Sequence, residues 1–241
     1  MRYYPIFLDL RGCWCAVVGG GRVAERKVRV LLQAGASVRV ISPGVTPRLA
    51  SLATRKKIDL VQRAYRRGYL KGRTSQPPRR SQGERSRRRR NLWPVLVFTA
   101  TDDPETQRAV ARDAEALGAL VNLVDDPQQS RFIVPASFAQ GDLQVAISTS
   151  GASPALARRL RRELQLALGL KYRAYLHFLR ESRRRVMESV PKGAERTRIL
   201  RQLAGKPMLD WWWKGEPKGA APNLRILLGK HTKARAEDSE S

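Results

Sequence analysis

The stretch that decides the fold runs Cys13-Trp14-Cys15-Ala16-Val17-Val18-Gly19-Gly20-Gly21-Arg22-Val23-Ala24. Its first six residues form a short apolar run, which predicts a buried strand. Three glycines end that run, and apolar side chains then recur at helical spacing as far as Ala34. A second apolar run follows at residues 37–41. Strand, glycine turn, helix and strand in this order predict one β-α-β unit.

The alternation of strand and helix continues along the first 125 residues. We expect further helices at residues 47–54 and 104–117, and further strands at residues 58–61, 95–98 and 119–124. Regular alternation of this kind predicts a doubly wound parallel sheet. The expected N-terminal domain is therefore a Rossmann domain over residues 1–125.

One segment interrupts the alternation. Residues 72–91 are rich in Arg, Ser, Gln and Pro and contain almost no apolar side chain. A segment of this composition cannot bury enough apolar surface to offset the entropy lost on ordering. We expect a disordered, basic surface insertion here.

The pattern changes after residue 125. Residues 132–134 and 143–148 are expected to be strands with no long helix between them, which gives a small α+β region over residues 126–152. Helical spacing dominates residues 153–205, and residues 206–241 are expected to form a flexible tail. The tail contains Trp211-Trp212-Trp213, for which a packed anchor and an interface patch are equally open. The predicted fold class is α/β, with the parallel sheet followed by the α+β region and a helical region.

Charge separates this chain from an average globular protein. Its 241 residues carry 47 Lys and Arg against 21 Asp and Glu, a net charge of +26. Such a balance indicates an anionic partner: nucleic acid, an acidic membrane surface or a polycarboxylate substrate. The charge is concentrated in residues 79–90 and 158–201, so it says less about the N-terminal domain.

Other residue patterns exclude several classes of protein. No signal peptide and no apolar stretch of membrane-spanning length are visible, so we expect a soluble, cytoplasmic protein that does not bind a membrane. Cys13 and Cys15 lack the spacing of a disulfide framework or zinc site and are expected to be core thiols. The two histidines, His177 and His231, form no cluster, so no resident metal is expected.

The glycine turn carries the first functional signal. Residues 19–24 fit the pattern G-x-G-x-x-G/A, in which Gly19 permits a tight turn, Gly21 lets a pyrophosphate approach and Ala24 permits close helix–sheet contact. The free N–H groups of the helix then bind the phosphates. Its position between a strand and a helix predicts a dinucleotide site. The alternative is a glycine turn that serves packing alone.

The sequence leaves the choice between NAD and NADP open. Ser42-Pro43 stands at the end of the second strand, where an acidic residue usually holds the ribose hydroxyls. Arg22 is either solvated or able to accept an extra phosphate. Thr101 and Asp102 follow the fourth strand, where they either contact the cofactor or cap the next helix. Cofactor contacts are expected at Gly19, Gly20, Gly21, Arg22, Val23, Ala24, Ser42, Pro43, Thr101 and Asp102.

Several motifs together resemble one family. They are Tyr4–Leu10, the glycine turn with Lys27, and residues 100–104, 121–125, 132–136 and 147–158. In this order they resemble the precorrin-2 dehydrogenase/sirohydrochlorin ferrochelatase family, which is also the N-terminal module of bacterial siroheme synthase. The resemblance covers residues 3–168. The insertion departs from the family pattern, and the chain after Lys206 has no match in it.

The resemblance implies an activity. NAD would accept a hydride from precorrin-2, a tetrapyrrole polycarboxylate, to give sirohydrochlorin in siroheme biosynthesis. Some members also insert ferrous iron, which is then a substrate. Members are homodimers, so residues 126–152 would form a central dimerisation and active-site region.

The resemblance also implies site residues, and each has a structural alternative. Asp125 matches the catalytic aspartate and would be the general base, unless it only caps a turn with Asp126-Pro127. Asp126 is the competing candidate for the base, and Asn122 is either a buried amide or a cofactor contact. Ser153 matches an active-site loop and would bind substrate with Ser150 and Arg158. Ser153-Pro154 is equally a helix start, and most of the neighbouring arginines are expected to be solvated.

Two rival functions remain. A chelatase without dehydrogenase activity is possible within the same chemistry, but such an enzyme needs no dinucleotide site. A Rossmann sensor with a nucleic-acid-binding insertion would use the arginines for phosphate contacts. That second rival lacks interleaved aromatic residues and any known reading module, so we do not expect nucleic acid as the partner.

Overall fold

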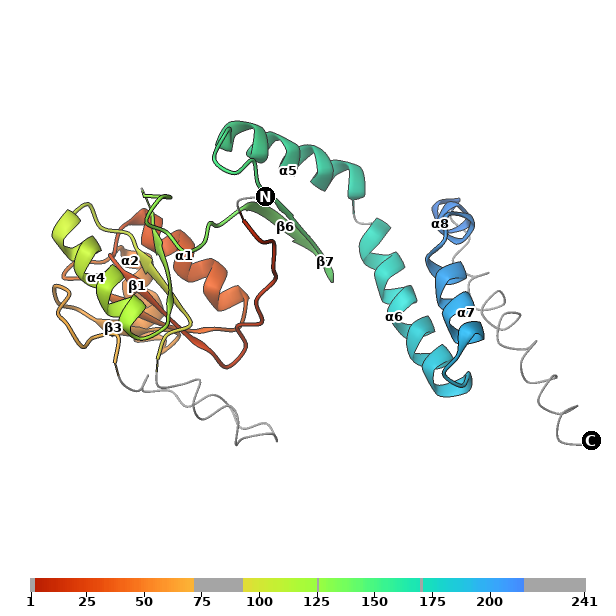
Figure 1. Cartoon of the computed structure of the whole chain (residues 1–241), viewed down its shortest axis with the longest axis horizontal. Coiled ribbons are helices and arrows are strands. Elements are labelled where there is room, and N and C mark those ends of the chain that lie inside the picture. The colour runs from red at the N-terminus through yellow and green to blue at the C-terminus, as the bar shows by residue number, and fades with distance from the viewer. Residues whose placement is uncertain (1–2, 72–92, 125, 170, 215–241) are drawn as a thin grey trace, which may run out of the picture. The chain divides into compact units, whose positions relative to one another are not determined.

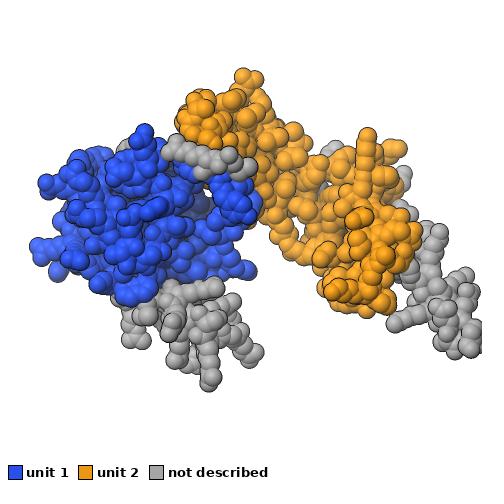
Figure 2. Space-filling view, viewed as in Figure 1, with its two compact units in different colours: residues 1–134 blue, residues 135–241 orange. Residues whose placement is uncertain are grey.

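The structure is a computed structural model that describes residues 3–71, 93–124, 126–169 and 171–214. The chain divides into two compact units, Met1–Val134 and Pro135–Ser241. Figure 1 shows the helices and strands and labels most of them, and Figure 2 colours the two units separately. The predicted insertion at residues 72–91 lies outside the described residues.

The first unit contains a five-stranded sheet with the order β3-β2-β1-β4-β5. Every neighbouring pair of its strands is parallel, which confirms the predicted doubly wound sheet. Its strands are β1 (Trp14–Val18), β2 (Ser37–Ile41), β3 (Asp59–Val61), β4 (Leu96–Thr99) and β5 (Leu120–Leu123). Its helices are α1 (Arg22–Gln33), α2 (Pro47–Thr54) and α4 (Pro104–Ala116).

Side chains of β1 alternate between two apolar cores, one on each face of the sheet. Cys15 and Val17 pack in the core that contains Ala24, Val28 and Leu31 of α1. Trp14, Ala16 and Val18 belong to the second core, which contains Val110 and Ala114 of α4. Because both faces of β1 are covered, all five of its residues are buried, as an apolar run requires.

An irregular segment, residues 65–70, packs in the second core beside α4. Arg39 on β2 holds it: its guanidinium contacts Asp59 at 2.7 Å, donates to the Tyr69 carbonyl oxygen at 3.1 Å and lies 5.3 Å from the Trp14 ring centre. The Tyr65 hydroxyl donates to Asp113 at 2.7 Å. Burial, followed by this hydrogen bond, raises the pKa of Tyr65.

The second unit contains an antiparallel hairpin, β6 (Ala136–Gln140) and β7 (Leu143–Ile147). The strand expected at residues 132–134 is therefore wrong, since the strand begins four residues later. Phe132 instead packs against Phe98 in the first unit, with the ring centres 5.3 Å apart. An apolar residue at position 132 is therefore explained by packing against the core of the first unit and not by a strand.

Between the hairpin and residue 214, where the described part of the chain ends, lie the helices α5 (Pro154–Leu168), α6 (Lys171–Ser189), α7 (Ala194–Ala204) and α8 (Lys206–Trp213). The part of the expected tail that the structure describes, residues 206–214, thus begins as a helix. Trp212 lies 5.5 Å from Tyr175 and 5.2 Å from Phe178, and Trp213 lies 4.9 Å from Tyr172, between ring centres. Two of the three tryptophans therefore pack against α6, as an anchor would.

Candidate cofactor-binding site

The candidate site lies at the carboxyl edge of the parallel sheet, where the strand order reverses. β1 has β2 on one side and β4 on the other, so the chain leaves β1 in one direction and later returns to its other side. In open α/β sheets, ligands bind beyond the carboxyl ends of the strands at such a point. The glycine turn, residues 19–21, follows β1 directly at this position.

Packing requires two of the three glycines in this turn. A Cβ atom at Gly19 would lie 2.1 Å from the carbonyl oxygen of Ala100, and Gly19 has a φ of +120°. A Cβ atom at Gly20 would lie 2.0 Å from the carbonyl oxygen of Gly44. Both distances are far below van der Waals contact, so any side chain at these positions would displace backbone. The packing alternative therefore accounts for Gly19 and Gly20.

Gly21 has no such requirement. Among the described residues other than its chain neighbours, no atom lies within 4 Å of the position of its missing Cβ, and its φ of −79° is open to any residue. Gly21 is the N-cap of α1, and this N-cap makes no side-chain hydrogen bond. Bare backbone at an uncapped helix start fits an approaching phosphate group. The residues present thus fit the pyrophosphate of a dinucleotide.

The next three residues of the fingerprint divide between surface and core. Arg22 and Val23 are exposed at the start of α1. Ala24 is fully buried in the core between α1 and the sheet, where the fingerprint expects a small residue.

The loop after β2, residues 42–46, lies beside the glycine turn and is called the β2 loop below. The Ser42 hydroxyl is buried and donates to the Gly44 carbonyl oxygen at 2.6 Å, so it shapes the loop. Pro43 and Gly44 are exposed, and open space surrounds the missing Cβ of Gly44. The Thr46 N–H donates to the Gly20 carbonyl oxygen at 3.0 Å.

Sequence reasoning missed Glu25 at this site. The Thr46 hydroxyl donates to its carboxylate at 2.8 Å, and Arg48 lies 3.6 Å from the same carboxylate. Thr46 also caps α2, since its hydroxyl oxygen accepts from the Leu49 N–H at 3.3 Å. Thr46 before Pro47 is a helix-start signal that the sequence contains, but nothing local connects it to a carboxylate 21 positions earlier.

Asp103, in the loop that follows β4, caps the N-terminus of α4. Its carboxylate accepts from the N–H groups of Glu105 and Thr106, and hydrogen bonds, first of all from the Thr106 hydroxyl, lower its pKa. The Thr101 hydroxyl accepts from the Asp103 N–H at 3.3 Å, so it belongs to the same turn. Asp102 is exposed beside them.

The end of β5 brings the next group of predicted residues to the same edge. The Asn122 side chain is buried and donates to the Phe132 carbonyl oxygen at 2.9 Å, as the buried-amide alternative predicts. Asp126 accepts from the N–H groups of Gln128 and Gln129 and so stabilises a turn. Asp125, the predicted base, lies outside the described residues.

The predicted substrate-binding residues lie in the second unit, at the start of α5. The Ser153 hydroxyl caps this helix by accepting from the Leu156 N–H at 3.2 Å, and the Ser153 N–H donates to Thr149 at 3.1 Å. Ser150 has a φ of +53°, which is rare for a residue with a side chain. Arg158 is exposed one turn into the helix.

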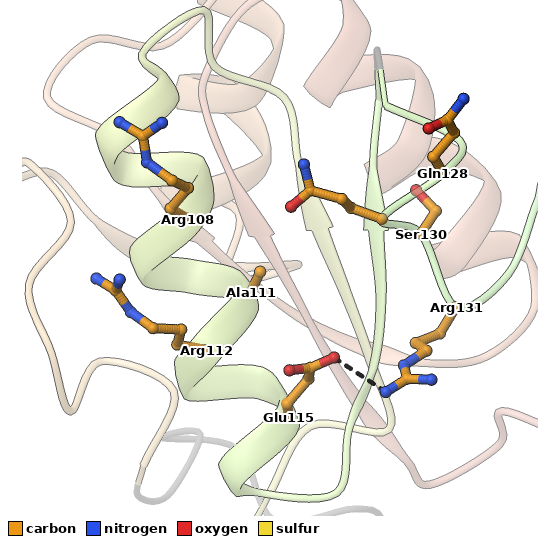
Figure 3. A pocket seen from close by; sticks show the side chains of 8 residues that line it. Arg108, Ala111, Arg112, Glu115, Gln128, Ser130 and Arg131 are labelled. Atoms are coloured by element: carbon orange, nitrogen blue, oxygen red, sulfur yellow. Dashed lines mark hydrogen bonds and ion pairs between the residues drawn. The ribbon is translucent and has the colours of Figure 1, made fainter.

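A shallow pocket of about 420 Å³ lies between α4 and residues 128–131 (Figure 3). Its lining includes Arg108, Arg112 and Arg131, which sequence analysis did not single out. Arg131 is paired with Glu115 at 3.2 Å. Figure 3 shows the side chains of Arg108 and Arg112 directed away from Arg131. The arginines do not converge on one point, so this pocket is not a candidate for substrate binding.

Within the part of the chain that the structure describes, no three His, Cys, Asp or Glu side chains come together as a metal site would require. None of the described helices is both long and apolar enough to span a bilayer.

Known proteins resemble this chain along nearly its whole length. It is 37% identical to a siroheme synthase of Chromobacterium violaceum and 35% identical to siroheme synthase 1 of Aeromonas salmonicida. Each alignment covers 98% of this chain and 46% of the relative. The chain thus spans about half the length of the curated relatives that it matches.

A solved structure shares the fold. The protein titled "SirC, precorrin-2 dehydrogenase" superimposes with a TM-score of 0.71 over 96% of this chain and 100% of its own, at 24% identity. Residues 140–165 match the family described as sirohaem biosynthesis protein central. Residues 6–136 match the family described as putative NAD(P)-binding, and this range covers the parallel sheet, the glycine turn and the β2 loop. The chain therefore belongs to this NAD(P)-binding family, and its relatives confirm the resemblance to siroheme synthases.

Proposed function

We propose that this chain oxidises precorrin-2 to sirohydrochlorin and transfers the hydride to NAD. The observation that carries the proposal is Gly21, whose bare backbone lies at an uncapped helix start at the reversal point of the sheet. Neither packing nor backbone conformation requires a glycine there, whereas the approach of a pyrophosphate would. The similarity to siroheme synthases supplies the substrate class.

Each half of the cofactor has residues to hold it. The N–H groups of residues 21–24 would bind the pyrophosphate, with Gly19 and Gly20 shaping the turn. Ser42 and Pro43 of the β2 loop would lie at the adenosine ribose, and Thr101 and Asp102 would lie near the nicotinamide. When bound, NAD supplies the hydride acceptor. We favour NAD over NADP because the family resemblance implies it.

Asp125 is the proposed general base. Its two neighbours are anchored at the carboxyl edge, since the Val124 N–H donates to Thr99 and the Asp126 N–H donates to Leu123. Loss of a hydride from the reduced macrocycle leaves one proton to be removed, and a carboxylate beside the ring can accept it. The Asp126 carboxylate is already engaged by the turn that it caps, which favours Asp125 for this role.

The start of α5 would bind the carboxylates of precorrin-2. A helix N-terminus attracts anions, and Ser150 and Ser153 lie at this one. The guanidinium of Arg158 can bind a carboxylate through two hydrogen bonds. Ferrous iron enters the proposal as a substrate of a second step, because the relatives are named siroheme synthases.

We extend the proposal to a homodimer in the cytoplasm. The family resemblance implies dimerisation through the central region, and residues 140–165 match the family described as sirohaem biosynthesis protein central. Cys13 and Cys15 are both free and buried, which is typical of proteins from a reducing compartment.

The test is a direct assay of the reaction. Purified protein is incubated anaerobically with enzymatically generated precorrin-2 and either NAD or NADP, and sirohydrochlorin and reduced cofactor are quantified after chromatographic separation. We expect equal amounts of both products with NAD. Gly21→Asp should abolish the reaction, and Asp125→Ala should slow it strongly, whereas Asp126→Ala serves as the matched control for the base.

Failure of this assay would point to one of the alternative functions. If folded protein gives no product with either cofactor, the dehydrogenase is refuted and chelation of supplied sirohydrochlorin is the next assay. If that also fails, the nucleic-acid alternative is tested by deletion of residues 72–91, which should abolish binding.

A further inference from the structure

The β2 loop is held in place by a closed ring of contacts that begins and ends at the glycine turn. From Gly20 the chain enters α1, whose Glu25 carboxylate accepts from the Thr46 hydroxyl at 2.8 Å. The Thr46 N–H returns to the Gly20 carbonyl oxygen at 3.0 Å. The ring thus joins the first turns of α1 to the start of α2 beside the glycine turn.

Close packing makes this ring tight. A Cβ on Gly20 would lie 2.0 Å from the Gly44 carbonyl oxygen and 2.8 Å from the Ser42 hydroxyl, so the β2 loop touches the bare backbone of Gly20. Gly21 and Gly44 both have open space where a Cβ would stand. The ring therefore holds the exposed backbone of the β2 loop against Gly20, the residue before Gly21.

Glu25 is suited to act through the loop. Its side chain is 24% exposed, whereas that of Arg48 is 69% exposed. An exposed ion pair at 3.6 Å adds little, while a partly buried hydrogen bond to a carboxylate is among the stronger ones. The contact with Thr46 therefore dominates. It leaves Thr46 able to cap α2, because the hydroxyl donates to Glu25 and accepts from Leu49.

We propose that Glu25 is a positioning residue for the dinucleotide: through Thr46 it holds the β2 loop at the glycine turn, in the place where the adenosine ribose binds. This inference rests on the proposed function only in requiring a nicotinamide dinucleotide as ligand. The loop offers backbone at this point in place of the usual acidic side chain, so its position determines the contact. Loss of the Glu25–Thr46 contact should weaken cofactor binding more than it affects the chemical step.

The test measures dissociation constants for NADH and NADPH by fluorescence titration of the full chain. Glu25→Ala and Thr46→Val should each weaken NADH binding about tenfold, which corresponds to one charge-assisted hydrogen bond. The double variant should be little weaker than either single one, because the two changes remove the same contact. Thr46→Ser and Glu25→Gln keep a donor and an acceptor, and should stay within about threefold of wild type. Arg29→Ala is the matched control, an exposed change on the same helix.

Unfolding temperatures and kinetics separate positioning from general stability. We expect the KM for NAD to rise about tenfold in Glu25→Ala while kcat changes less than about threefold. Wild-type affinity in a folded Glu25→Ala protein overturns this inference alone, as does a double variant whose losses add fully. Absence of binding of either nucleotide to the wild type overturns the proposed function together with it. If Glu25→Ala does not fold, the Thr46→Val and Thr46→Ser pair decides.

Discussion

Replacement of Gly21 by alanine should separate cofactor binding from folding. Apart from its chain neighbours, no part of the chain that the structure describes lies within 4 Å of the added methyl group, and the φ of −79° suits alanine. Alanine narrows the unfolded ensemble, which stabilises by about 0.4–1 kcal/mol, but it is a poorer N-cap than glycine by about the same amount. The free energy of unfolding should therefore stay within about 1 kcal/mol of wild type.

Cofactor affinity should respond very differently. The methyl group would stand where the pyrophosphate approaches the start of α1, and would displace it from one or two N–H donors. Each charge-assisted hydrogen bond contributes about 1.5–3 kcal/mol, so NADH should bind about 10- to 100-fold more weakly or worse. Gly20→Ala is the contrasting variant, because its methyl group would lie 2.0 Å from backbone and should destabilise the fold by about 1–3 kcal/mol.

Two measurements on each variant decide the matter: urea denaturation for stability and NADH titration for affinity. The reasoning requires that Gly21→Ala is stable but binds weakly. A stable Gly21→Ala protein with wild-type affinity would refute a pyrophosphate at this position. A strongly destabilised one would show that the open space at Gly21 is filled in solution.

Three further predictions concern charge and burial. Arg39→Ala should lower the free energy of unfolding, measured in urea, by about 3 kcal/mol, because it removes the ion-pair partner of Asp59 at 2.7 Å. Arg159→Ala breaks an exposed ion pair and should change that free energy by less than about 1 kcal/mol. Equal effects of the two variants would contradict the importance of burial. Tyr65 has a pKa raised above its ordinary value of 10.0, so its contribution to stability is fully present below pH 10 and declines as the pH rises further; Tyr65→Phe should lack that alkaline decline in thermal melts. Burial, followed by the nearby charge of Arg26, lowers the pKa of Lys27 below 10.5, so the charged side chain destabilises the fold at pH 7. Lys27→Met should therefore melt at a higher temperature than wild type at pH 7, and the difference should vanish as the pH rises toward 10.5. A lower melting temperature of Lys27→Met would show that the contact of Lys27 with the Phe98 ring outweighs its desolvation.

Local signals predicted much of the fold. Helices α2, α4 and α5 begin at Pro47, Pro104 and Pro154, and each has a capping Thr, Asp or Ser immediately before it. A proline at the first helical position and a capping residue before it act within a few residues, so the sequence alone reveals them. The glycine turn between β1 and α1 is equally local.

Contacts between distant residues escaped prediction. The apolar run at residues 132–134 resembles a strand, but Phe132 is apolar because it packs against Phe98. Strand β6 has only one large apolar residue, Phe138, so its sequence alone does not indicate a strand. It is a strand because it pairs with β7. In the same way, no periodic pattern links Glu25 with Thr46 or Arg39 with Tyr69, because these contacts depend on how the chain returns to the sheet.

The anchoring of residues 65–70 by Arg39 and Asp113 has a consequence for how the chain can vary in length. The crossover from β3 to β4 is fixed at Leu70 on one side and at Val95 on the other, where the Val95 N–H donates to Trp14. For a disordered insertion, which the sequence predicts at residues 72–91, the entropy of joining the two anchors grows only with the logarithm of the number of residues, and doubling that number costs about 0.6 kcal/mol. We therefore expect residues added or removed there to change the stability of the sheet, and the site at its carboxyl edge, very little. This crossover is the place in the domain where a graft, a tag or a shortened connection should be accepted most readily.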